Sequence, residues 1–252
     1  MTRKIALITG GSRGLGRNTA IHLAEKQVDI VLTYLSNQAA AEAVISEIHA
    51  CGGGAVALQL DTGDTSQFAA FSKTLGKVLA ETWQRKTFDF LVNNAGIGIN
   101  KPFADTSEDD FDRLLNMHFK GVYFLTQRLL PVIEDGGRIV NLSTGLARFT
   151  MPGYSAYAAM KGAVEILTRY MASELGSRGI TANAIAPGAI ETDFGGGVVR
   201  DNPQINQIVA SMTAMGRVGL PEDVGGAIAS LLTGDNQWVT GQRIEVSGGQ
   251  NL

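Results

Sequence analysis

Thr9-Gly10-Gly11-Ser12-Arg13-Gly14-Leu15-Gly16 is the stretch that decides how this chain folds. It follows a short apolar run at 4–9 and leads directly into a segment with helical spacing at 14–27. Glycines at a tight strand-to-helix turn let the backbone approach a pyrophosphate, whose charge is stabilised by the first N–H groups and the dipole of the helix. The stretch therefore predicts a strand-helix-strand unit that binds a phosphate-bearing ligand.

The same alternation of apolar runs and helical segments continues to the end of the chain. Because strand-helix alternation is typical of parallel sheets, we expect an α/β fold: a single doubly wound parallel sheet of the Rossmann type, with helices on both faces. No linker divides the chain, so 1–252 is predicted to form a single domain for dinucleotide binding and catalysis. The predicted strands are 4–9, 29–34, 55–60, 88–93, 138–142, 181–185 and 243–246, and the predicted helices are 14–27, 38–50, 66–84, 108–130, 155–177 and 221–233.

Composition narrows the classes of function. The 252 residues carry a formal net charge of -3 with no cationic run, which argues against nucleic acid or a membrane surface as a partner. No window approaches the roughly 20 apolar residues of a membrane helix. The single cysteine, Cys51, cannot form an internal disulfide, and with three histidines the chain offers no metal-ligand cluster. We therefore expect a cytoplasmic protein without a metal.

One segment, 191–215, departs from the alternation. It contains Gly195-Gly196-Gly197, Pro203 and a weakly amphipathic piece at 204–212. Such a segment is typical of a mobile flap over a site. The alternative is a surface excursion without a role.

The glycine spacing at 10, 14 and 16 resembles the T-G-x-x-x-G-x-G loop of the short-chain dehydrogenase/reductase family. Further motifs of that family follow in the same order along the chain. They are Asn93-Asn94-Ala95-Gly96, Tyr157-Ala158-Ala159-Met160-Lys161, Pro187-Gly188-Ala189-Ile190-Glu191-Thr192, Gly216-Arg217, Pro221-Glu222-Asp223 and Ser247-Gly248-Gly249.

The resemblance implies a nicotinamide dinucleotide as cofactor. The residues expected to hold it are Gly10, Ser12, Arg13, Gly14, Leu15, Gly16, Tyr34, Ser36, Asn37, Asp61, Thr62, Asn94, Ala95, Gly96, Tyr157, Lys161, Pro187, Gly188, Ile190 and Thr192.

Arg13 and the end of the second predicted strand indicate which dinucleotide is used. NAD-preferring sites place an acid at that end, whereas 33–37 contains none. Arg13 can instead neutralise a 2′-phosphate, with Ser36 and Asn37 donating hydrogen bonds, and in the family a basic residue at the position of Arg13 implies NADP. We therefore expect NADP(H) rather than NAD(H). Two alternatives remain: Arg13 is a solvated loop charge, and Asp61 only caps the helix that follows it.

Tyr157 and Lys161 are the expected acid/base pair. Four residues apart on a helix, they share a face and lie about 6 Å apart along its axis. A nearby ammonium is expected to lower the pKa of Tyr157 by about two units, which would make the phenol a useful proton carrier. By resemblance, Lys161 also holds the nicotinamide ribose. Without the glycine loop, the same pair would be read as surface decoration.

A hydroxyl is expected to help Tyr157 polarise the substrate carbonyl. In the family this is a serine, most often thirteen residues before the tyrosine, and that position here is Thr144 with Ser143 beside it. Adjacent residues on a strand point to opposite faces, so we expect one of the two to reach the substrate. Thr144 is favoured, and Ser143 is expected to bond the local backbone.

His118 marks the main departure from the family. Aligned on Gly121, it occupies the position of an asparagine that holds a water of the lysine proton relay. An imidazole can keep such a relay, but it titrates near neutral pH, so we expect activity to fall as His118 becomes protonated. The alternative is a histidine packed in its helix without a catalytic part.

These residues predict an enzyme that reduces a ketone or other carbonyl to an alcohol with NADPH, a 3-ketoacyl chain being one candidate substrate. The alternatives are an NAD(P)-dependent alcohol or sugar dehydrogenase, which shares every catalytic residue, and a nucleotide-binding sensor without turnover. The resemblance also implies a homotetramer or homodimer, formed through the helices that bear the catalytic segments and through 241–252.

Overall fold

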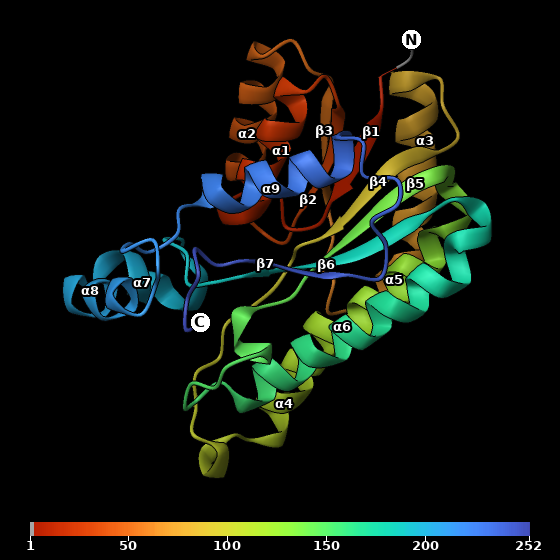
Figure 1. The fold of residues 1–252 in the computed structure, drawn as a ribbon. Coiled ribbons are helices and arrows are strands. Elements are labelled where there is room, and N and C mark those ends of the chain that lie inside the picture. The colour runs from red at the N-terminus through yellow and green to blue at the C-terminus, as the bar shows by residue number, and fades with distance from the viewer. Residues whose placement is uncertain (1–2) are drawn as a thin grey trace.

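The computed structural model describes residues 3–252, and these contain one seven-stranded sheet (Figure 1). All neighbouring strands run parallel, in the order β3-β2-β1-β4-β5-β6-β7. The direction of winding reverses between β1 and β4, which makes a doubly wound sheet and confirms the predicted fold class. The strands are β1 Ile5–Ile8, β2 Asp29–Tyr34, β3 Ala55–Gln59, β4 Phe88–Asn93, β5 Ile133–Leu142, β6 Thr181–Pro187 and β7 Arg243–Val246.

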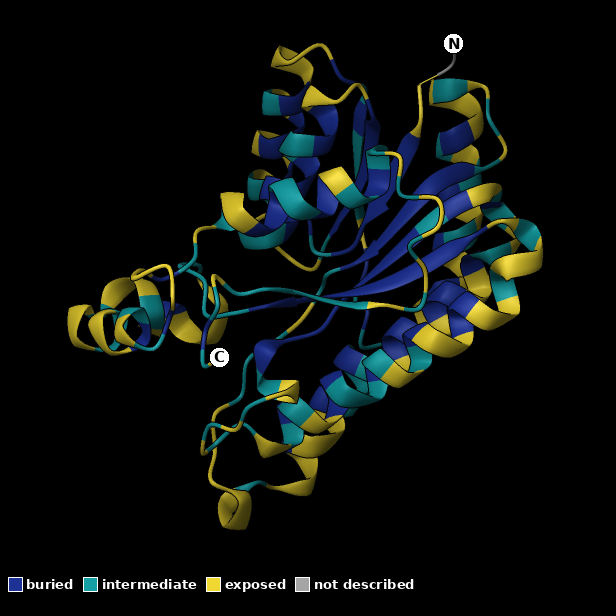
Figure 2. Ribbon diagram, viewed as in Figure 1, coloured by how far each residue is buried: buried dark blue, intermediate teal, exposed yellow. Residues whose placement is uncertain are grey.

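Alternate residues of the strands enter two separate cores. In β1, Ala6 and Ile8 face helices α1 (Gly14–Glu25), α2 (Gln38–Ala50) and α9 (Pro221–Thr233). Ile5 and Leu7 face α3 (Phe68–Trp83), α5 (Gly121–Leu129) and α6 (Ser155–Leu175) on the other side. A strand buried on both faces consists almost entirely of apolar residues, which is why these strands are continuous hydrophobic runs (Figure 2).

The expected helix 108–130 is wrong as a single element. It divides into α4 (Glu108–Leu115), a π-helical turn at Asn116–Lys120, α5 and a 3₁₀ turn at Leu130–Val132. The extra residue of a π turn shifts the register of the side chains that follow it. Gly121 closes this turn against the backbone of Thr62, where a side-chain Cβ would lie 2.0 Å from the Thr62 carbonyl oxygen. The break in the helix therefore coincides with a tertiary contact between Gly121 and Thr62.

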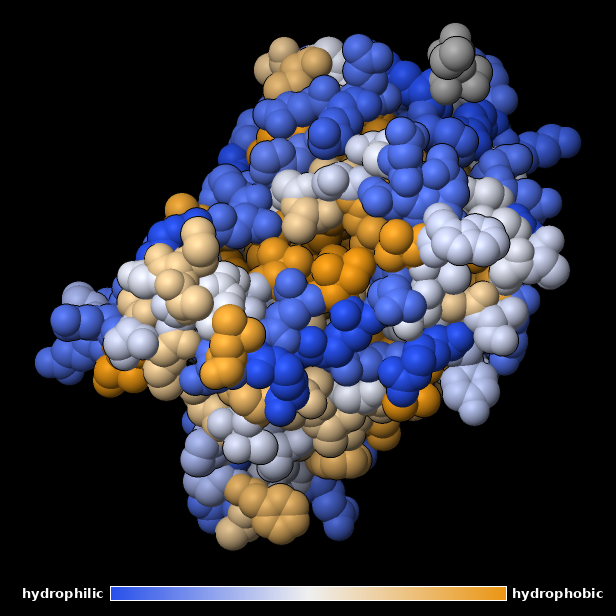
Figure 3. All heavy atoms as spheres, in the orientation of Figure 1, coloured by the Kyte–Doolittle hydropathy of each residue, from blue (hydrophilic) through white to orange (hydrophobic). Residues whose placement is uncertain are grey.

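The predicted flap, residues 191–215, lies at the carboxyl-terminal end of the sheet (Figure 1). It contains a 3₁₀ turn at Phe194–Gly197, helix α7 (Val198–Asp201) and helix α8 (Pro203–Ser211). Strand β7 forms an edge of the sheet, and apolar atoms line a hollow between it and α9 (Figure 3). Among residues 3–252, none of the helices has both the length and the hydrophobicity that crossing a bilayer requires.

Candidate active site

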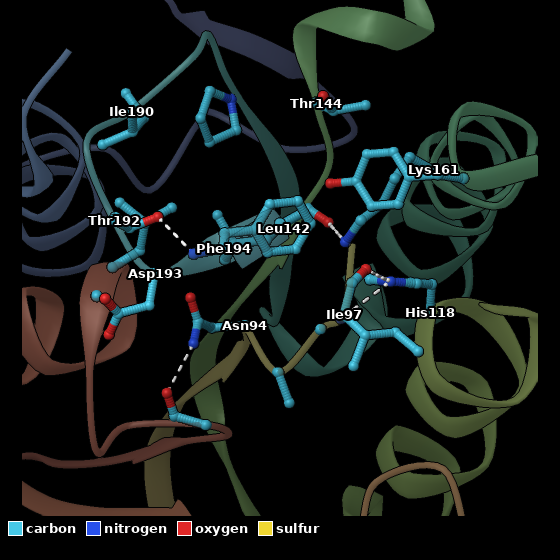
Figure 4. A pocket seen from close by; sticks show the side chains of 18 of the residues that line it. Asn94, Ile97, His118, Leu142, Thr144, Lys161, Ile190, Thr192, Asp193 and Phe194 are labelled. Atoms are coloured by element: carbon cyan, nitrogen blue, oxygen red, sulfur yellow. Dashed lines mark hydrogen bonds between the residues drawn. The ribbon is translucent and has the colours of Figure 1, made fainter. Parts of the chain in front are cut away.

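A cavity of about 680 Å³ opens at the carboxyl ends of strands β1 to β6 (Figure 4). Ligands bind at this edge of doubly wound sheets, where the loops after neighbouring strands separate. All of the expected catalytic residues line the cavity: Tyr157, Lys161, Thr144, Ser143 and His118. Of the expected cofactor residues, Gly16, Ser36 and Asn37 lie outside its lining.

Gly16 shapes the glycine loop from behind. A Cβ at this position would lie 2.3 Å from the Gly10 carbonyl oxygen and 2.5 Å from the side-chain amide of Asn94, so no side chain fits. That amide donates to the carbonyl oxygens of Thr9 at 2.9 Å and Gly10 at 3.1 Å, which ties the loop to the end of β4. The result is a fixed backbone cradle before the N-terminus of α1, which fits a diphosphate.

At the end of β2, fewer of the polar side chains that were expected to bind the cofactor reach the cavity. Arg13 reaches it with a side chain that is 68% exposed, and its Nη1 lies 3.7 Å from a carboxylate oxygen of Asp193. Asn37 is exposed and accepts a hydrogen bond from the Ala40 N–H as the N-cap of α2. Ser36 is also exposed, and Leu35 lines the cavity in its place.

Asp61 lies at the cavity wall and not at a helix cap. Its Oδ1 accepts a hydrogen bond from the Gly63 N–H at 2.8 Å. The following helical turn is capped by Asp64, which accepts from the Ser66 N–H at 3.0 Å. Asp64, and not Asp61, therefore caps this helical turn.

The two candidate hydroxyls beside Tyr157 have different partners. The Thr144 hydroxyl faces the Tyr157 phenol closely enough to favour its ionised form, and the Thr144 oxygen accepts a hydrogen bond from the Leu146 N–H at 3.3 Å. Ser143 donates instead to Glu165 Oε1 at 2.5 Å, a side-chain partner and not the backbone expected for it. The geometry favours Thr144 as the hydroxyl that acts with Tyr157.

Lys161 is buried beneath Tyr157. Its Nζ donates to the Leu142 carbonyl oxygen at 2.6 Å and lies 5.8 Å from the centre of the Tyr157 ring (Figure 4). Burial lowers the pKa of Lys161 to about 7, because a buried ammonium loses its hydration.

The expected fall in the Tyr157 pKa is wrong. Burial raises the pKa of this phenol, the nearby Thr144 hydroxyl opposes the rise, and the neighbouring Tyr154 adds to it. The charge of Lys161 favours the phenolate, but the loss of hydration of the buried phenol is the larger effect. The phenol therefore stays protonated at neutral pH.

His118 projects from the π turn into the site and is 1% exposed. Its ring lies edge-on to that of Tyr157, with centroids 5.1 Å apart. Nε2 lies 2.7 Å from the Ile97 carbonyl oxygen and 3.3 Å from the Ile97 N–H, so either tautomer of the ring bonds this backbone (Figure 4). Nδ1 is buried and has no hydrogen-bond partner within residues 3–252.

The expectation that His118 titrates near neutral pH is wrong. Burial lowers its pKa to about 3, with a smaller contribution from the charge of Lys161 and an opposing one from the bond to Ile97. A group with this pKa remains uncharged throughout the range in which enzymes are usually assayed. A fall in activity on protonation of His118 is therefore not expected in that pH range.

Phe194, a residue that the sequence did not single out, brings the flap over the catalytic pair. Its ring centroid lies 5.7 Å from that of Tyr157, and the side chain is 42% exposed. Around it the cavity is largely apolar, with walls from the loops after β4 and β5 and from the flap. These walls include Ile97, Leu146, Phe149, Met151, Tyr154, Val198, Val199, Ile205 and Val209.

Within the part of the chain that the structure describes, no group of three histidine, cysteine or acidic side chains is placed to hold a metal. The polar chemistry of the cavity instead converges on Tyr157 and Thr144, whose hydroxyls can both donate to one carbonyl oxygen. Lys161 lies behind them, and the glycine cradle lies at the other end of the cavity. This arrangement suits proton transfer to an oxygen beside a long phosphate-bearing ligand.

Comparison with known proteins agrees with this geometry. The family model described as enoyl-(acyl carrier protein) reductase matches residues 10–251. The hydroxynaphthalene reductase-like protein Arp2 of Metarhizium brunneum is 34% identical over 98% of this chain and 94% of its own. Versicolorin reductase 1 of Aspergillus parasiticus is 34% identical over 98% of this chain and 95% of its own.

Solved structures resemble the whole chain as well. The promiscuous reductase LugOII, which catalyses keto-reduction at C1 in lugdunomycin biosynthesis, has a TM-score of 0.94 and 37% identity, covering 100% of this chain and 99% of its own. The angucycline C-6 ketoreductase LanV with bound NADP has a TM-score of 0.93 and 32% identity, covering 98% of this chain and 95% of its own.

Proposed function

The chain belongs to the short-chain dehydrogenase/reductase family, and we propose that it reduces a ketone of a polycyclic aromatic compound to an alcohol with NADPH. The observation that carries the proposal is the paired Tyr157 and Thr144 hydroxyls, which face a cavity with aromatic and aliphatic walls. Relatives named for hydroxynaphthalene, versicolorin and angucycline reduction support the substrate class.

When bound, NADPH supplies the hydride that reduces the carbonyl carbon. The Tyr157 hydroxyl donates its proton to the carbonyl oxygen. Its raised pKa means that the phenol carries this proton at neutral pH, although it is then a weaker acid. Thr144 donates a second hydrogen bond to the same oxygen. Lys161, when charged, stabilises the phenolate that remains and returns a proton to it.

The experiment is an NADPH-oxidation assay with a panel of hydroxylated naphthalenones, anthraquinones, 3-ketoacyl thioesters and simple sugars, run also in the alcohol direction with NADP⁺. Turnover of the polycyclic ketones is expected, and Tyr157→Phe is expected to lower kcat by about 10²–10⁴-fold because the proton donor is lost. Tyr170→Phe, which removes an exposed phenol, is the control. Unchanged turnover in Tyr157→Phe contradicts the mechanism, and NADPH binding without any turnover favours the sensor.

Arg13 supports the choice of NADP(H) over NAD(H). Its exposed guanidinium has only a loose ion pair with Asp193, so it is free to turn toward a 2′-phosphate at the end of β2. We expect Arg13→Ala to weaken NADPH binding about 10- to 100-fold in a fluorescence titration and to leave NADH binding unchanged. Arg169→Ala, also at an exposed position, is the control. Equal losses for both dinucleotides would assign Arg13 to another role.

We propose further that residues 1–252 work as a single domain in which the flap closes over the substrate. A homotetramer or homodimer is supported by large apolar side chains left exposed on α5 and α6, and by the apolar hollow beside the edge strand β7 (Figure 3). The cytoplasm is the proposed compartment, consistent with a single, free and exposed Cys51.

A further inference from the structure

Gln250, near the end of the chain, reaches back into the cavity. Its side chain lines the cavity wall, although the residue is only 2% exposed. Its Oε1 accepts a hydrogen bond from the Ala189 N–H at 2.8 Å. Ala189 belongs to the turn 187–190 at the end of β6. Gln250, which lies in the loop after β7, therefore holds the main chain of this turn.

The C-terminal segment, residues 247–252, is itself held to the flap. The Asn251 N–H donates to the Met212 carbonyl oxygen at 2.9 Å, and the Met215 N–H donates to the Gly248 carbonyl oxygen at 3.0 Å. The turn and the end of the flap are thus tied through one short segment.

Arg148 fixes the same segment from the catalytic side. Its guanidinium donates to the Gln250 carbonyl oxygen at 2.7 Å and the Asn251 carbonyl oxygen at 2.8 Å. It also forms a bidentate ion pair with Glu245 at the end of β7, with distances of 2.8 and 2.7 Å. Arg148 lies four residues after Thr144, so Gln250 is anchored to the loop that carries the catalytic hydroxyl.

We propose that Gln250 is a positioning residue that fixes the turn 187–190 and thereby sets how tightly the nicotinamide end of NADP(H) is held. This inference rests on the proposed function. Hydride transfer must occur beside Tyr157 and Thr144, and the turn lines the cavity next to the Thr144 loop, where a Cβ at Gly145 would lie 3.4 Å from the Pro187 carbonyl oxygen. Without the Gln250 oxygen the Ala189 N–H loses its partner, and the turn is free to leave its position.

The test compares two ligands in fluorescence and calorimetric titrations: NADPH, and 2′,5′-ADP, which lacks the nicotinamide end. In Gln250→Met the acceptor oxygen is lost with little change in shape, and we expect the Kd for NADPH to rise about five- to tenfold. The Kd for 2′,5′-ADP is expected to stay unchanged. Gln250→Glu keeps an acceptor and is expected to restore NADPH binding to within about twofold of the wild type.

Gln207→Met, at an exposed position of α8, is the matched control. Arg148→Met releases the same segment without altering Gln250, and it is expected to give the same selective loss. Equal NADPH binding in Gln250→Met and wild type overturns the inference. An equal loss of affinity for both ligands also overturns it, because that result would indicate a general loosening of the cofactor site. A wild type that does not bind NADPH overturns the proposed function itself.

Discussion

His118 places a buried nitrogen without a partner directly beside the catalytic phenol. Within residues 3–252, Nδ1 finds no hydrogen bond, and protonating it would bury a charge next to Lys161. The folded protein therefore accepts a proton on this ring only below about pH 3, whereas the unfolded chain accepts one below its ordinary pKa of 6.5. Between these two values the unfolded state binds more protons, so stability falls as the pH falls.

This difference predicts a change in acid stability for His118→Asn. Relative to pH 8, at pH 4.5 the wild type is expected to lose about 2–3 kcal/mol of unfolding free energy through this group alone. Asparagine does not titrate, so the variant avoids this part of the loss, whatever its stability at pH 8. Urea unfolding at both pH values measures the difference. If the difference in unfolding free energy between the two proteins is the same at both pH values, His118 is as easily protonated in the folded state as in the unfolded one.

At the residue scale, the sequence predicts which side chains form the site better than it predicts their protonation states. Tyr157 and Lys161 were found because their motif resembles that of the short-chain dehydrogenase/reductase family, and helical spacing predicted that they share a face. The glycine loop was found because its turn is local in sequence. The pKa of Tyr157 depends on how many other segments cover it, including Phe194 and His118. Burial of that kind is a tertiary property, so the direction of the shift could not be read from spacing.

At the element scale, the strands followed from their apolar runs, whereas the π turn at Asn116–Lys120 did not. It ends at the close contact between Gly121 and the backbone of Thr62, two segments far apart in sequence. The flap was predicted from its composition, and its Gly195, Gly196 and Gly197 all have positive φ angles of 63° to 80°. A glycine run in this conformation lets the chain turn sharply after Phe194 and direct that ring at Tyr157.

The flap predicts a selective effect on substrate binding. Phe194→Ala removes the ring that covers Tyr157, and we expect the KM for a polycyclic ketone to rise about tenfold because roughly 1–1.5 kcal/mol of aromatic contact is lost. The Kd for NADPH is not expected to change more than about twofold. Phe103→Ala, at a position 87% exposed and outside the cavity lining, is the control in steady-state kinetics. An unchanged KM in Phe194→Ala would leave the flap without a role in holding the substrate.

At the scale of the whole molecule, helices α5 and α6 carry part of its exposed apolar surface. Helix α6 bears Tyr157 and Lys161 on its buried side, while Tyr170 is 63% and Ile166 48% exposed. Helix α5 leaves Tyr123 and Phe124 40% and 43% exposed. These side chains are the surface that the proposed assembly would cover.

If copies of the chain associate through α5 and α6, a charge on that surface should separate them. Tyr170→Glu would place a carboxylate among apolar side chains of the partner, where its desolvation opposes association. Light scattering after size exclusion is expected to give a dimer or tetramer for the wild type and a smaller species for the variant. Because α6 carries the acid/base pair, kcat should fall with the loss of association. Phe103→Glu, an equally large change at a site 87% exposed, should alter neither. A Tyr170→Glu protein of unchanged mass would remove this surface from the proposed assembly.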